Sequence, residues 1–176
     1  MKYGCITLSI LLLLIVPLAA QILTPSPINP TIDGSIGVGE YSQVIQLNNM
    51  RFSYALSNNT KILYFVLEAP TSGWVSIGLD SNRMNGAHFI IGYDAISTQV
   101  INEESGRGRS HSPSSEKILL ESKIREVGGK TTLEFSIPSS LYEAKKELDL
   151  IVSYGSQDNV RSKHTRYDRH TITFQK

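Results

Sequence analysis

From residue 44 onward the sequence consists of short apolar runs separated by Gly, Asn, Asp and Ser. In the run 51–57, Phe52, Tyr54 and Leu56 alternate with small or polar residues. This period of two is typical of a strand with one buried face. Many short strands with frequent turn signals predict an all-β sandwich or barrel, with no internal repeat.

These runs predict ten strands and at most one short helix. The run 62–67 is apolar at nearly every position, which favours a central strand covered on both faces. Residues 139–147 are the candidate helix, and the polar, Gly/Ser/Pro-rich segment 105–115 is predicted to be a mobile surface loop. The predicted strands cover 44–47, 51–57, 62–69, 74–79, 88–93, 99–103, 118–125, 131–137, 148–154 and 171–174.

The first twenty residues have the layout of a secretory signal peptide. Lys2 precedes an apolar run at 6–16, and small residues end the segment at Ala20. We therefore expect cleavage near Ala20 and an exported protein, in the periplasm or outside the cell; an uncleaved membrane anchor is the alternative. Residues 21–30 are predicted to be an extended Pro-rich arm, and 31–176 the single folded domain.

Cleavage would remove Cys5, the only cysteine of the chain. The mature protein would then lack disulfides, iron–sulfur clusters, cysteine-ligated zinc and covalently attached haem. The chain holds 17 Lys+Arg and 16 Asp+Glu, a balance that argues against nucleic-acid binding. Since no nucleophile–base couple or nucleotide fingerprint is evident, we expect a binding domain or electron carrier, with no catalytic residues.

Two residues stand out because they occupy polar connections between predicted strands. Met84 lies among turn residues in 80–86, and His164 lies in the cationic segment 161–169. Met84 is either a flexible filler at the edge of the core or a thioether ligand. His164 is either a solvated loop residue or an imidazole ligand. His170 opens the last predicted strand and is expected to face solvent or flank the site.

The sequence resembles the DOMON domain family from about Thr31 to Phe174. The stretches that carry the resemblance are 31–41 (TIDGSIGVGEY), 73–92 (GWVSIGLDSNRMNGAHFIIG), 130–141 (KTTLEFSIPSSL) and 164–174 (HTRYDRHTITF). Members of this family are immunoglobulin-like antiparallel β-sandwiches. Some bind b-type haem, as in the cytochrome domain of cellobiose dehydrogenase, and others are thought to bind sugars.

The resemblance implies non-covalent haem b held by Met84 and His164, with His170 as the reserve ligand. Two departures stand out: His88 where many relatives have an acid, and Tyr167 to His170 where a glycine after the arginine is common. A Met/His pair fills both axial positions of the iron, which suits transfer of single electrons. Haem also requires an apolar slot and cations for its propionates. The candidates for these are Trp74, Phe65, Phe89 and Ile91 for the slot, and Arg166 and Arg169 for the propionates.

Two alternative functions remain open at this point. One is a sugar-binding module in which Tyr54, Tyr64 and Trp74 stack on a ring. The other is a Cu(I) site formed by Met84 and His88, since thioether and imidazole ligands suit that ion. For the cytochrome, the partner is expected to be a separate redox protein or a membrane cytochrome.

Overall fold

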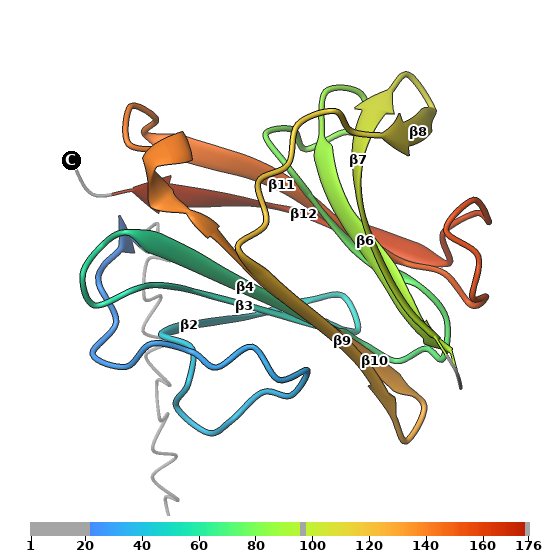
Figure 1. The fold of residues 1–176 in the computed structure, drawn as a ribbon, viewed down its shortest axis with the longest axis horizontal. Coiled ribbons are helices and arrows are strands. Elements are labelled where there is room, and N and C mark those ends of the chain that lie inside the picture. The colour runs from blue at the N-terminus through green and yellow to red at the C-terminus, as the bar shows by residue number, and fades with distance from the viewer. Residues whose placement is uncertain (1–21, 96–97, 175–176) are drawn as a thin grey trace, which may run out of the picture.

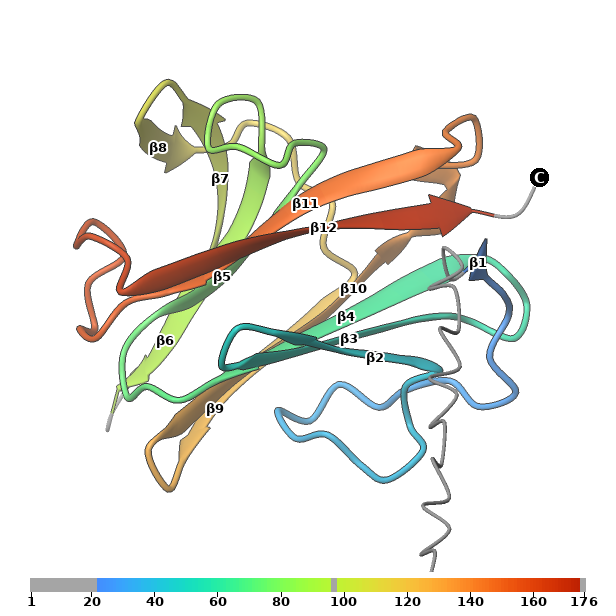
Figure 2. The same ribbon diagram turned by 180° about the vertical axis from the view of Figure 1, so that it is seen from behind.

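The computed structural model describes residues 22–95 and 98–174, so the predicted signal peptide lies outside the described residues. Two β-sheets face each other and enclose one core (Figures 1 and 2). The predicted all-β sandwich is confirmed. No helix of the described residues has the length and apolar character that crossing a membrane would require.

Seven strands form one sheet in the order β1-β12-β11-β5-β6-β7-β8, and five form the other in the order β2-β3-β4-β10-β9. All neighbours are antiparallel except β1 and β12, which are parallel. The seven-stranded sheet contains β1 (Ile22–Leu23), β5 (Val75–Leu79), β6 (His88–Ala95), β7 (Thr98–Arg107), β8 (Ser110–Pro113), β11 (Glu147–Tyr154) and β12 (Arg166–Phe174). The five-stranded sheet contains β2 (Gln43–Leu47), β3 (Met50–Leu56), β4 (Ile62–Ala69), β9 (Glu121–Val127) and β10 (Lys130–Pro138).

The core lies between the sheets because alternate residues of each strand point inward. Phe52, Phe65 and Phe135 are fully buried, and the Phe65 ring stacks on the other two, with centroids 6.4 Å and 5.3 Å away. From the other sheet, Ile77 and Leu150 pack into the same cluster. No cysteine contributes, so apolar burial carries the stability of the sandwich.

The segment 21–30, predicted to be an extended Pro-rich arm, contacts the sandwich from Ile22 onward. β1 pairs with the end of β12, and Leu23 is buried in the core. Ile32 and Ile36 pack against Tyr41 and Tyr64 on the outer face of the five-stranded sheet. The domain therefore begins before Ile32, because this sheet has an apolar outer face that the segment covers.

Two local predictions were wrong. Segment 105–115 is not a mobile loop, because β7 extends to Arg107 and forms a hairpin with β8. Residues 139–147 form only a 3₁₀ turn, Ser139–Leu141, since the following Tyr142 is drawn into the core and β11 begins at Glu147. In both places a tertiary contact overrides the local sequence preference.

Candidate functional site

The outer face of the seven-stranded sheet, turned away from the five-stranded sheet, has a floor of small and apolar residues. Ser76 on β5 and Ser153 on β11 share a hydrogen bond of 2.7 Å. Beside them lies Gly78, where an added Cβ would come within 2.7 Å of the Phe89 ring and 2.9 Å of Ile151. These five residues, called the floor below, include the Phe89 ring, which packs directly over Gly78.

Two loops bound the floor. The loop 80–87 joins β5 to β6, and the loop 155–165 joins β11 to β12. Because Leu79 pairs with Leu150 and Val75 pairs with Tyr154, the two loops start from opposite ends of the same strands. Figure 1 shows them at these two ends, in green and in orange to red. Both loops return toward the outer face, since the Met84 carbonyl lies against Gly106 and Val160 packs on Ile91, and Ser76 is only 1% exposed.

Met84 lies in the β5–β6 loop and is half-buried. Its carbonyl oxygen lies against Gly106 of β7, where a Cβ would be only 1.8 Å from it. Among the described residues, Met84 belongs to none of the three hydrophobic clusters, whereas Met50 is fully buried in the main core. Met84 is therefore not part of these clusters, and its role as a thioether ligand stays a prediction.

His164 is half-buried at the end of the β11–β12 loop, and its ring meets the edge of the Tyr167 ring at 5.1 Å. Arg169 lies over the same Tyr167 ring, and its Nε donates a 2.8 Å hydrogen bond to the carbonyl of Asn82. Contacts thus run from His164 through Tyr167 and Arg169 to a residue two positions from Met84. Side chains of β12 therefore connect the two loops, although no direct contact between the loops is seen among the described residues.

The slot candidates fall on two different sides of the sheet. Phe89 is part of the floor, and Trp74 and Ile91 form a small cluster with Val160 of the β11–β12 loop. Trp74 also donates from Nε1 to Ser162 Oγ at 2.9 Å, which ties this loop to β5. Phe65 was wrongly placed, because it lies in the core on the five-stranded sheet. Since nearly every residue of β4 is apolar, the sequence does not indicate its orientation.

Arg169 and Arg166 are both exposed at the beginning of β12. Arg169 faces outward with Tyr167 and has only its Nε committed to Asn82. Its terminal nitrogens remain suited to an anionic group at the rim of the floor. Arg166 is two residues from His164 on the same strand end.

The other two histidines considered as ligands point away from the floor. His88 faces the interior side of β6, and its Nε2 lies 3.1 Å from Glu103 Oε2. A copper pair of Met84 and His88 therefore loses its geometric basis. His170 also points inward, against the rings of Phe52 and Tyr54. The expectation that His170 faces solvent or flanks the site was wrong, because Tyr167 and Arg169 occupy the outer positions of the β12 alternation.

Burial lowers the pKa of His170 below its ordinary value of 6.5, and its buried Nε2 has no hydrogen-bond partner. Below pH 6.5 the His170 imidazole becomes protonated in the unfolded chain, whereas in the folded protein it stays neutral until the pH reaches the lowered pKa. We therefore expect the free energy of unfolding to fall as the pH drops from 6.5 through the lowered pKa. His170→Phe should remove this part of the pH dependence in urea titrations between pH 7 and 5. An unchanged profile would contradict the prediction.

Sequence reasoning missed a charged cluster on the outer face. Glu104 of β7 is fully buried and contacts both Arg161 of the β11–β12 loop and His111 of β8. His111 also packs on the Phe89 ring, with centroids 5.9 Å apart. The available signal was the strand alternation of β7, which places Glu104 beside Phe89.

The aromatic residues proposed to stack on a sugar are all buried. Tyr54 lies in the core, Tyr64 is covered by the N-terminal segment, and Trp74 is covered by the β11–β12 loop. They do not form an open platform.

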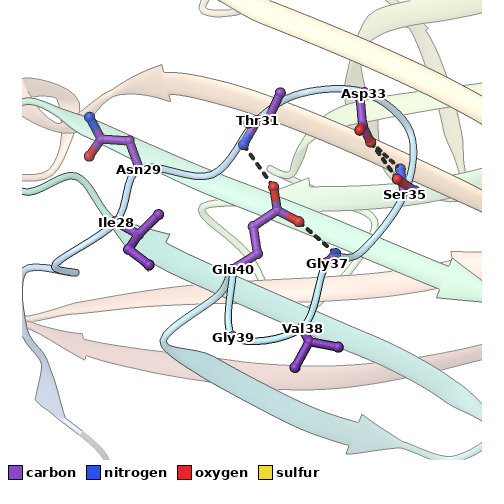
Figure 3. A pocket seen from close by; sticks show the side chains of 9 residues that line it. All are labelled: Ile28, Asn29, Thr31, Asp33, Ser35, Gly37, Val38, Gly39 and Glu40. Carbon is purple, nitrogen blue, oxygen red and sulfur yellow. Dashed lines mark hydrogen bonds between the residues drawn. The ribbon is translucent and has the colours of Figure 1, made fainter.

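A separate hollow of about 320 Å³ lies over the other sheet, within the loop that contains residues 28–40 (Figure 3). Both oxygens of Glu40 accept backbone hydrogen bonds there, from Thr31 at 2.8 Å and from Gly37 at 2.7 Å. Asp33 likewise accepts from the backbone and hydroxyl of Ser35. The acids of this hollow therefore stabilise the loop itself.

Comparison with known proteins shows similarity of fold only. No family model and no curated protein matches the sequence. Among solved structures, the cytochrome b domain of pyranose dehydrogenase from Coprinopsis cinerea superposes with a TM-score of 0.56 at 10% identity, over 76% of this chain and 81% of that one. The cytochrome domain of Myriococcum thermophilum cellobiose dehydrogenase gives 0.53 at 12% identity, with the same coverages. The resemblance to DOMON cytochrome domains is confirmed at the level of the fold.

Proposed function

We propose, starting from a fold shared with cytochrome b domains, that this chain binds haem b non-covalently and transfers single electrons. The observation that carries the proposal is the path of contacts from His164 through Tyr167 and Arg169 to the loop of Met84. A thioether and an imidazole on two loops beside one apolar surface are the donors that a six-coordinate haem requires.

The residues around the floor fit haem in their chemistry. Phe89 and Ile151 offer an apolar surface, and the absence of a side chain at Gly78 lets these two side chains pack closely over the strand. Because the two loops cover this surface, a ring reaches it as the loops part. Arg169 at the rim would supply a cation for a propionate, because its guanidinium group can pair with a carboxylate. Arg166 is paired with Tyr154 and lies on the other side of the β12 alternation, with His170.

Haem with two protein ligands supplies one-electron chemistry, with methionine favouring a higher reduction potential than a more basic donor. The chain's own residues set the conditions for it. Met84 and His164 would be the two protein ligands that hold the iron, a donor pair that suits electron transfer rather than oxygen binding. Trp74 holds the His164 loop next to β5 through its hydrogen bond to Ser162, and the apolar residues of the floor would help to exclude water from the bound group.

Export and partner choice are part of the same proposal. A signal peptide at 1–20 would place the domain outside the cytoplasm, and a thiol-free sandwich suits such a compartment. A separate redox protein or a membrane cytochrome would then exchange electrons with it.

Absorption spectra of the purified protein, recorded oxidised and reduced after haem addition, test the proposal. We expect a Soret band and split visible bands on reduction. Met84→Leu should remove the sulfur ligation and lower the reduction potential while costing less than about 1.5 kcal/mol of stability. His164→Ala should weaken haem binding by more than the roughly 10- to 100-fold that loss of an outer-shell partner produces.

Matched controls separate ligation from packing. Met50→Leu makes the same replacement in the core, and His170→Phe removes the reserve histidine; both should leave the bands unchanged. A folded protein that takes up no haem would overturn the proposed function. Bands that survive His164→Ala but vanish in His170→Phe would reassign the imidazole ligand.

A further inference from the structure

The buried carboxylate of Glu104 lies on the outer face of the seven-stranded sheet, next to the floor. Its side chain is 1% exposed. A carboxylate withdrawn from water in this way is unfavourable unless a positive charge and hydrogen bonds compensate for it. The residue must therefore have a structural or functional partner.

Arg161 provides that partner from the β11–β12 loop. Its NH1 donates to Glu104 Oε2 at 2.7 Å and its NH2 to Oε1 at 3.0 Å, which makes the pair bidentate. NH1 also donates to the carbonyl of His111 at 2.6 Å, and His111 Nδ1 contacts the same carboxylate. One guanidinium thus connects the loop to both strands of the β7–β8 hairpin.

Arg161 is three residues before His164, in the best-anchored part of the loop. Val160 packs on Trp74 and Ile91, and Ser162 accepts from the Trp74 indole. These contacts attach the loop to β5 and β6. The Arg161–Glu104 pair, called the clasp below, extends the attachment to β7, on the far side of Phe89.

We infer that the clasp holds the His164 loop closed over the floor, so that Arg161 and Glu104 are positioning residues for the histidine ligand. This inference rests on the proposed haem site. The carboxylate is buried whether or not the loop carries a ligand, and the bidentate pair, together with the Arg161 bond to the His111 carbonyl, fixes the distance between loop and hairpin. Opening of the clasp frees the loop to part from the floor, which controls how fast a planar ligand leaves.

Amide hydrogen exchange and haem dissociation test the clasp in the full chain. In Arg161→Gln, exchange of the amides at 159–165 should rise at least about 10-fold without haem, since local opening sets these rates. Haem affinity should fall roughly 10- to 100-fold, as for loss of an outer-shell partner. Arg161→Lys should show intermediate values, because an ammonium does not reproduce the two parallel bonds. Lys163→Gln removes an exposed cation from the same loop and should change neither measurement.

Glu104→Gln keeps the shape of the side chain and guards against a variant that merely misfolds. It should raise exchange in the loop as Arg161→Gln does, and the double variant should add little to either one. Unchanged loop exchange in both single variants would overturn the clasp, whatever the haem result. A wild-type protein that takes up no haem, with loop exchange still raised in the variants, would refute the proposed function and leave the clasp as an anchor of the loop only.

Discussion

Phe65→Ala is expected to lower the free energy of unfolding by about 3–5 kcal/mol, the usual range for a large aromatic side chain removed from a core. Phe65 is fully buried and stacks on both Phe52 and Phe135. Strands on either side hold the backbone of β4, so the cavity has little freedom to collapse. Urea unfolding followed by fluorescence measures the change.

Phe89→Ala is the matched comparison, because Phe89 is an equally apolar residue on the outer face. It should destabilise the fold less than Phe65→Ala and weaken haem binding more. Phe65→Ala should retain its haem spectrum wherever it remains folded. Equal losses of stability in the two variants would contradict the assignment of Phe65 to the core and Phe89 to the floor.

Glu134→Ala is expected to be the second severe substitution. This buried carboxylate accepts hydrogen bonds from Tyr41 Oη at 2.8 Å, from Gly34 N at 2.5 Å and from Asp33 N at 3.0 Å. Each buried donor left without an acceptor costs about 1–3 kcal/mol, so we expect a loss of about 3 kcal/mol or more. The N-terminal segment should detach from the outer face of the five-stranded sheet, which limited proteolysis near Gly34 would reveal.

Glu134→Gln provides the control, because an amide oxygen can accept from both backbone donors while its NH₂ group faces Tyr41. It should lose much less stability than the alanine variant. Burial raises the pKa of Glu134 above its ordinary value of 4.5 despite these hydrogen bonds. The stability of the wild type relative to Glu134→Gln should therefore fall as the pH rises through that raised pKa. A difference independent of pH would show that the carboxyl group does not titrate abnormally.

Strand positions were predictable where one face is apolar and the other polar. The alternation in 51–57 correctly indicated the side of β3 that faces the core, although Ser53 and Ala55 on its other side are buried as well. The same method gave no orientation for β4, which is apolar on both faces, and Phe65 was assigned to the wrong side for that reason. The β7–β8 hairpin was missed because its residues are polar. Its contact with Arg161, which lies 57 positions from Glu104 in the sequence, leaves no local signal.

Within the site, Met84 and His164 were singled out as candidate ligands because of their polar surroundings. The structure places both on loops that border the floor. The direction of His170 was misjudged because β12 begins at Arg166, several residues before the predicted start. Its pairing with Leu150, a core residue of β11, is what turns His170 inward. Arg161 and Glu104, the two residues of the clasp, are far apart in the sequence, so no local sequence pattern predicts their contact.

The pairing of β1 with β12 has a consequence for association between copies of the chain. An unpaired strand edge can recruit another chain, and within residues 22–95 and 98–174 the sole neighbour of β12 at this edge is the two-residue strand β1. These cover the less polar end of β12, at Thr173 and Phe174. The other end displays the charges of Arg166, Asp168 and Arg169, which discourage edge-to-edge pairing. This edge of the seven-stranded sheet is thus protected by strand pairing at one end of β12 and by charged side chains at the other.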